Sequence, residues 1–364
     1  MPICNRSKIR PDVLKLIDDF VKHQTEGVMG YLPTLGSQAM TFGALYPKVI
    51  SGNEIFFKTK GTEADIYSYF TKEEMILLAK VFRYGFDYAA NVDQKTYPIP
   101  KNVKVEKIDA GGVPAEWQTA PDAKKNRVLL YFHGGGMVLG SPNSHRLFTV
   151  ALGQLTKMRV LSLDYRLAPE HAYPSQLEDC IAAYKWLLSK GIKPENIVIA
   201  GDSAGGSLTL MTLLKLRNDG IPLPVGAVSL SPDTDWSGSD ELFWKNAETD
   251  PVLADIGLFW WVPAYLAGAD PNDPMISPLF ADLEGLPPLL VQASTSEMLY
   301  GGAKRFADRA KEAGVDVTFE TWDGMPHVWQ SFGLEVLPEA KQATAKIGEF
   351  IQKLFESKTI QIEQ

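Results

Sequence analysis

One serine stands in a setting that could make it a nucleophile. Ser203 lies in the stretch GDSAGG, with Gly201 and Gly205 two residues away on either side. The β-branched run at 196–200 predicts a buried strand before it, and the run at 207–217, without Gly or Pro, predicts a helix after it. Such a tight strand-to-helix turn exposes the serine hydroxyl and tolerates only small neighbours. A glycine-rich turn that holds a phosphate, or nothing, is the alternative that this stretch alone leaves open.

A serine hydroxyl needs a base at neutral pH, and His327 is the histidine best placed to supply it. It ends the loop 324–327, which follows a predicted strand at 315–321 and lies C-terminal to the serine. A structural histidine is the alternative. The other four histidines fall in a predicted helix, in a glycine loop that one of them is expected to brace, and in two polar segments: His23, His133, His145 and His171.

The base in turn needs a carboxylate that orients its ring and stabilises the imidazolium. Glu297 follows a predicted strand at 288–293 and lies between Ser203 and His327 in the chain. Asp323 is the rival, although its place before a glycine favours a turn-forming role. The order serine, acid, histidine is that of α/β hydrolases rather than of trypsin-like or subtilisin-like enzymes.

A glycine run could supply the donors that stabilise an oxyanion. His133 and three glycines directly follow a predicted strand at 128–132. Backbone N–H groups of Gly134 and Gly135, together with that of Ala204 after the serine, would bind the oxyanion of a tetrahedral intermediate. A plain flexible turn is the alternative.

Strands and helices alternate from about residue 127 onwards. This order predicts an α/β fold, with a mostly parallel central sheet covered by helices on both faces. The expected strands are 103–108 and 113–119 as a hairpin, then 128–132, 159–163, 197–201, 225–230, 288–293 and 315–321, and the expected helices are 177–188, 204–217, 304–312 and 338–354.

Residues 1–100 differ from the rest and are expected to form an N-terminal helical cap region, with 101–364 as the catalytic domain. The apolar pattern at 11–21 predicts an amphipathic helix, and Thr71 with Glu74 begins another that runs towards Tyr88. The stretch 27–57 is rich in Gly, Pro and aromatic residues and has no clear period.

Composition narrows the class of partners. The 364 residues carry a formal net charge of −8, which argues against nucleic acid or an anionic membrane as partner. Two cysteines far apart predict neither a disulfide framework nor a cysteine metal site. Since no apolar run approaches the length of a membrane span and no secretory signal is visible, we expect a cytoplasmic protein without stable membrane insertion.

Four motifs together resemble the hormone-sensitive-lipase family, the bacterial family IV carboxylesterases of the α/β-hydrolase superfamily. They are His133–Gly136 with Gly140 and Ser141, the run DYRLAPEH at 164–171, the GDSAGG stretch at 201–206, and GMPH at 324–327. The resemblance implies an α/β-hydrolase fold and the hydrolysis of small-molecule esters with short to medium acyl chains. It also implies that this reaction needs no cofactor or metal. It also implies a structural role for 164–170, a helical cap over the pocket and a possible homodimer. Most members carry Asp where Glu297 stands.

Aromatic residues late in the chain could line an apolar substrate pocket, with core packing as the alternative. The same reactive groups would also serve a lactonase, an amidase or a peptidase on this fold. A non-catalytic small-molecule receptor is a further alternative, although such a receptor would lack the base that His327 supplies. The candidate lining residues are Trp236, Phe259, Trp260 and Trp261.

Overall fold

A single sheet of eight strands forms the centre of the described residues, in the order β1-β2-β4-β3-β5-β6-β7-β8. The computed structural model describes residues 3–62, 67–255 and 257–362. From β4 to β8 neighbouring strands run parallel, whereas β1 and β2 form an antiparallel hairpin on β4. The strands are β1 (Lys104–Asp109), β2 (Pro114–Thr119), β3 (Lys124–Phe132), β4 (Met158–Leu163), β5 (Ile197–Asp202), β6 (Gly226–Leu230), β7 (Leu289–Ser294) and β8 (Val317–Trp322).

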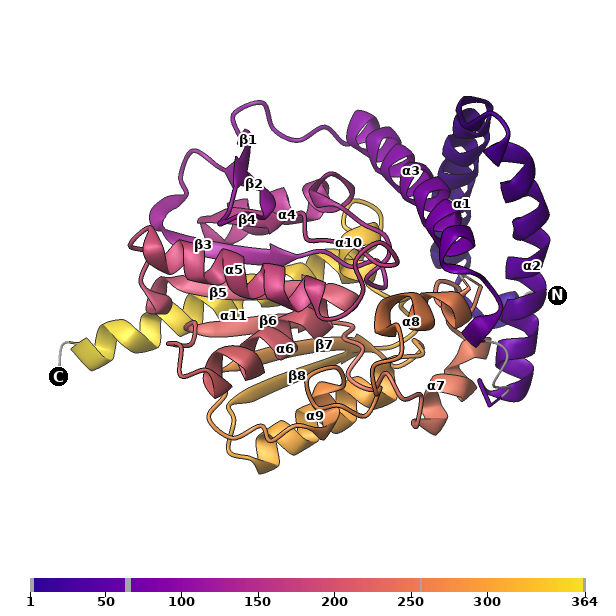
Figure 1. The fold of residues 1–364 in the computed structure, drawn as a ribbon. Coiled ribbons are helices and arrows are strands. Elements are labelled where there is room, and N and C mark those ends of the chain that lie inside the picture. The colour runs from indigo at the N-terminus through magenta and orange to yellow at the C-terminus, as the bar shows by residue number, and fades with distance from the viewer. Residues whose placement is uncertain (1–2, 63–66, 256, 363–364) are drawn as a thin grey trace.

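Helices cover both faces of this sheet (Figure 1). Alternate residues of β3 face opposite sides: Leu130 packs with α5 (Ser175–Ser189) and α6 (Ala204–Asn218), and Leu129 packs with α4 (Pro142–Thr156) and α11 (Pro338–Ile362). Helix α9 (Tyr300–Glu312) lies beside β7 and β8. The expected mostly parallel α/β fold is confirmed.

Three further helices precede the sheet in the chain and lie together at one end of it (Figure 1). They are α1 (Pro11–Tyr31), α2 (Gln38–Thr59) and α3 (Lys72–Thr96). Helix α1 packs on α3, α2 packs on α8 (Leu258–Leu266), and α3 packs on α4. The short helices α7 (Glu241–Lys245) and α10 (Trp329–Phe332) complete this end of the molecule. The N-terminal segment therefore meets segments from much later in the chain.

The stretch 27–57, in which the sequence shows no clear helical period, is mostly helix α2 in the structure. Its buried residues Phe42, Leu45, Val49 and Phe56 follow a helical spacing. Pro47 and several glycines lower the helix propensity of this sequence, but tertiary packing stabilises the helix nevertheless. A Cβ on Gly52 would come within 2.3 Å of the Phe259 ring, so this glycine lets α2 approach α8 closely.

Candidate active site

Ser203 occupies the sharp turn between β5 and α6. Its backbone has φ 52° and ψ −122°, a left-handed conformation that ordinary residues adopt only at a cost. The neighbouring chain is so close that a Cβ on Gly201 would lie 2.3 Å from the Gly205 carbonyl oxygen, and one on Gly205 would lie 2.0 Å from that of Phe132. The glycines on either side of the serine are therefore a steric requirement of this turn.

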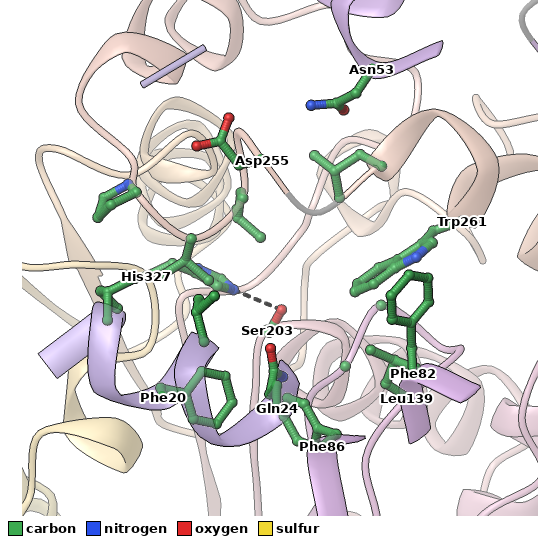
Figure 2. A pocket seen from close by; sticks show the side chains of 18 of the residues that line it. Phe20, Gln24, Asn53, Phe82, Phe86, Leu139, Ser203, Asp255, Trp261 and His327 are labelled. Atoms are coloured by element: carbon green, nitrogen blue, oxygen red, sulfur yellow. Dashed lines mark hydrogen bonds between the residues drawn. The ribbon is translucent and has the colours of Figure 1, made fainter. Parts of the chain in front are cut away.

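Three side chains from separate strand ends meet at this turn. His327 Nε2 lies 2.8 Å from Ser203 Oγ, and His327 Nδ1 lies 2.5 Å from Glu297 Oε2. Figure 2 shows the imidazole pointing at the serine hydroxyl. The second oxygen of Glu297 accepts the backbone N–H of Ser294 at 2.8 Å, which fixes the carboxylate. Glu297, which is longer than the Asp of most family members, thus contacts the histidine with one oxygen while the other binds the backbone of its own loop.

The environment of His327 favours its protonated form. Burial alone would lower the pKa of this imidazole, but the hydrogen bond and the charge of Glu297 outweigh it. Asp250 and Asp202 add to the negative potential, and the pKa of His327 is raised above its ordinary value. The arrangement therefore stabilises an imidazolium next to the serine.

Two residues that the sequence did not suggest hold the Glu297 loop. Buried Asp250 accepts the N–H of Met298 at 2.9 Å, and its other oxygen accepts two N–H groups of its own turn. Asn246 donates to the carbonyl of Glu297 at 2.9 Å. The rival acid Asp323 instead accepts from Thr295 Oγ1 at 2.7 Å. Asp250 and Asn246 lie about 50 residues before the acid, so only the folded chain reveals their role.

The glycine loop differs from the sequence expectation at one position. The N–H of Gly134 donates to the carboxylate of Asp202 at 3.2 Å, so it points under the loop and not into the pocket. Gly135 and Gly136, with φ of 118° and 61°, line the pocket beside Ala204. Within the described part of the chain, the N–H groups of these three residues have no hydrogen-bond partner. The unpaired N–H groups at the cavity wall are therefore those of Gly135, Gly136 and Ala204, and that of Gly134 is not among them.

A buried polar cluster supports the glycine loop from below. The Tyr131 hydroxyl donates to Asp202 at 2.5 Å, and His145 Nε2 lies 3.2 Å from the same carboxylate. Burial acts to raise the pKa of Asp202, but the neighbouring His145 and Tyr131 outweigh it and lower that pKa. The sequence shows His145 in a polar segment, and the structure buries its side chain.

His133 braces the loop from a buried position. Its Nδ1 lies 2.8 Å from the Gly134 carbonyl, and its ring stacks on Tyr165 at 4.2 Å between centroids. Tyr165, which belongs to the DYRLAPEH run, donates to the His133 carbonyl at 2.6 Å. Burial lowers the pKa of His133 to about 3, so the imidazole is neutral at physiological pH.

A cavity of about 830 Å³ opens onto Ser203 and His327. Its walls come from α1, α2 and α3 and from the segment around α8 (Figure 2). Trp236 and Trp261 line it, as expected, whereas Phe259 and Trp260 do not. These two occupy another face of α8, where Phe259 contacts Phe70 and Trp260 stacks on Phe82. One helix thus presents Trp261 to the cavity and its two preceding aromatic residues to the protein core.

No group of three or more His, Cys, Asp or Glu side chains among the described residues is arranged to hold a metal ion. Nor does any helix in the described ranges have the length and apolar character that crossing a membrane requires.

Comparisons with known proteins identify the family of the chain. A family model described as alpha/beta hydrolase fold matches residues 129–331. An acetyl-hydrolase of Streptomyces hygroscopicus is 41% identical over 245 residues, covering 67% of this chain and 81% of the relative. An esterase of Acinetobacter venetianus is 38% identical over 266 residues, covering 72% and 87%.

Solved structures are similar over most of their length. A crystal structure of an esterase from the bacterial hormone-sensitive lipase family has a TM-score of 0.72 and 41% identity, covering 85% of this chain and 98% of that one. The structure of EstE5 soaked with p-nitrophenyl butyrate has a TM-score of 0.72 and 37% identity, covering 85% and 99%.

Proposed function

Because the chain belongs to the alpha/beta hydrolase fold family, and within it to the hormone-sensitive-lipase esterases, we propose that Ser203, His327 and Glu297 carry its ester hydrolysis. The protein is a carboxylic ester hydrolase that acts on small-molecule esters. The observation that carries the residue assignment is the position of His327, hydrogen-bonded to the serine on one side and to the glutamate on the other.

In the proposed reaction the serine is acylated and then released by water. His327 takes the proton of Ser203 as the hydroxyl oxygen attacks the ester carbonyl, and it then protonates the leaving alcohol. A water molecule next gives a proton to His327 and attacks the acyl carbonyl. His327 returns that proton to Ser203 Oγ as the acyl bond breaks, which releases the free acid. Glu297 holds the imidazole in place and stabilises its protonated form, which the raised pKa of His327 supports.

We propose Gly135, Gly136 and Ala204 as the oxyanion donors. Their unpaired N–H groups at the cavity wall support this set, and the bond from Gly134 to Asp202 argues against Gly134. Preorganised donors of this kind stabilise the negative charge of the tetrahedral intermediate.

Residues 1–100 are proposed to act as the cap that shapes the substrate site, with residues 101–364 as the catalytic domain. Support comes from the cavity lining, to which α1 contributes Phe20 and Gln24 and α3 contributes Phe82 and Phe86 (Figure 2). The cavity volume and its largely apolar lining favour short- to medium-chain esters. A homodimer and a cytoplasmic location stay predictions.

A chromogenic ester series of increasing acyl length, run beside an aminoacyl anilide and a lactone, tests this function. We expect rapid cleavage of the short esters, slower cleavage of long ones and little of the anilide. A faster reaction with the anilide or the lactone would instead favour the peptidase, amidase or lactonase alternative. Binding without any turnover would favour the receptor.

A further inference from the structure

Asp233 places a carboxyl group in the substrate cavity that the reaction steps above do not use. It follows β6 by three residues and lines the same cavity as Ser203 and His327. Its carbonyl accepts a hydrogen bond from Ser207 Oγ at 2.6 Å, and the N–H of Ser207 binds the Ser203 carbonyl at 3.0 Å. One helical turn of α6 therefore ties Asp233 to the nucleophile.

One oxygen of this carboxyl group remains available to a substrate. Asp233 Oδ1 accepts the N–H of Asp235 at 3.2 Å. The other oxygen has no partner among the described residues, and it is not sealed from the cavity. Asp235 itself is engaged with Ser237 and Ser239 and lies 3.4 Å from Arg305. The chain thus leaves a free hydrogen-bond acceptor in the same cavity as Ser203 and His327.

Among the described residues that line the cavity, no lysine or arginine is paired with Asp233. Arg6 is the one lysine or arginine among the described cavity-lining residues, and both of its close contacts go to Asp18. Burial, followed by the charge of Asp235, raises the pKa of Asp233 to about 7, against the opposing effect of His327. The carboxylate is therefore poorly solvated, and a donor from the substrate would stabilise it.

We propose that Asp233 is a specificity-determining residue that selects esters carrying a hydrogen-bond donor, a hydroxyl or an ammonium group, near the scissile carbonyl. The assignment rests on the proposed function of Ser203. A donor there pairs with the free carboxyl oxygen, whereas an alkyl group leaves the carboxyl buried without a partner. A substrate carboxylate at the same place meets a like charge and is disfavoured.

Pairs of esters that differ by one donor test this assignment. Hydroxyethyl butanoate is compared with propyl butanoate, propyl β-hydroxybutanoate with propyl isovalerate, and dimethylaminoethyl butanoate with isopentyl butanoate. Monopropyl succinate supplies the carboxylate. The measurement is kcat/KM, obtained by titrating the carboxylic acid that hydrolysis releases. The pH is held at about 7.5, above the pKa of Asp233. The proteins are the wild type, Asp233→Leu and Asp233→Asn, with Asp255→Asn as control.

Asp255 is a matched control because it lines the same cavity with a carboxyl group but lies away from Ser203 (Figure 2). The wild type should prefer the donor ester by about 10-fold in at least one pair, as one hydrogen bond to a charged group allows. In Asp233→Leu this ratio should fall close to one, and in Asp255→Asn it should persist. Asp233→Asn should keep a hydroxyl preference and lose an ammonium preference.

Ratios are taken within one variant, so a loss of activity common to both esters cancels. A wild-type ratio near one in all pairs, or a ratio that persists in Asp233→Leu, overturns the role of Asp233. If the leucine variant does not fold, an ammonium preference that survives in Asp233→Asn does the same. Failure to hydrolyse propyl butanoate through Ser203 would instead count against the proposed function itself.

Discussion

The backbone N–H of Gly134 donates to the carboxylate of Asp202, the residue immediately before the serine of the turn. This bond fastens the first glycine of the loop to the strand that ends in the nucleophile. The next two N–H groups consequently stay free at the cavity wall, where Gly135 and Gly136 lie. The set of oxyanion donors that we propose thus follows from a contact beneath the loop.

Gly136→Ala should lower kcat/KM by about 100-fold, the size expected for a lost oxyanion donor. An added Cβ would lie 2.1 Å from Cε3 of the Trp261 ring, so the loop must move. Combining this change with Trp261→Ala should recover at least about tenfold, although the φ of 61° still costs the alanine variant some stability. Trp261→Ala alone is the control, and no recovery in the double variant would contradict this steric account.

Ser203→Ala should reduce kcat by about ten-thousandfold or more, because no other group can form the acyl-enzyme. Its melting temperature should stay at or above that of the wild type, because the substitution leaves unchanged Gly201 and Gly205, which the turn requires. A fluorescent phosphonate should label the wild type and not the variant. Turnover close to the wild-type rate would remove Ser203 from the mechanism.

Glu297→Gln should lower kcat by about a thousandfold or more, since the neutral amide neither stabilises the imidazolium nor enforces the right tautomer. Asp323→Asn should change kcat by less than about fivefold, because Asp323 binds Thr295 and not His327. Both variants are measured with the same short-chain ester. The opposite ranking would transfer the acid role to Asp323.

The acid limb of the pH profile should report the raised pKa of His327. The base must be neutral, so kcat/KM rises as pH increases through the pKa of this imidazole, with a midpoint above the ordinary value of about 6.5. In Glu297→Gln the residual activity should titrate at lower pH, because the main cause of the upward shift is lost. A midpoint that does not move between the two proteins would show that another group controls this limb.

Arg83→Met should destabilise the contact between α3 and the glycine loop. Arg83 donates to the carbonyls of Val138 at 2.7 Å and Ala168 at 2.6 Å and pairs with Glu170 at 2.8 Å. We expect a loss of about 2–4 kcal/mol in the free energy of unfolding, because buried acceptors lose a charged donor. Urea denaturation measures it.

Lys22→Met is the matched control, since its pair with Glu26 is exposed and 4.0 Å apart. It should cost less than about 0.5 kcal/mol. Equal losses in the two variants would mean that Arg83 acts as an ordinary surface charge.

The strand ends were predictable because the apolar runs and their loops are local features. Ser203, Glu297 and His327 could be proposed together, since parallel strands bring their carboxyl ends to one edge of a sheet. Which glycine N–H stays free could not be read in the same way, because it depends on Asp202, 68 residues later in the chain.

The other two differences between the sequence prediction and the structure concern which face of a helix is buried. Helix α2 carries a regular buried stripe, but its proline and glycines hide it from propensity arguments. Within α8, the choice between Trp261 and Trp260 as lining residue depends on how the helix is rotated against α2 and α3. The rotation of α8 cannot be inferred from its composition or from the residues next to it in the sequence.

The position of α1 also bears on how the chain is made. Val13 and Ile17 of α1 pack against Met325, Trp329 and Leu337, about 300 residues later. A ribosome adding roughly 5–20 residues per second takes about 15–60 s to reach them. During that interval Val13 and Ile17 lack these partners, although α3, which packs on the same helix, has already been made. The substrate cavity can therefore close only after synthesis has almost ended, although its first wall is the earliest part of the chain to emerge.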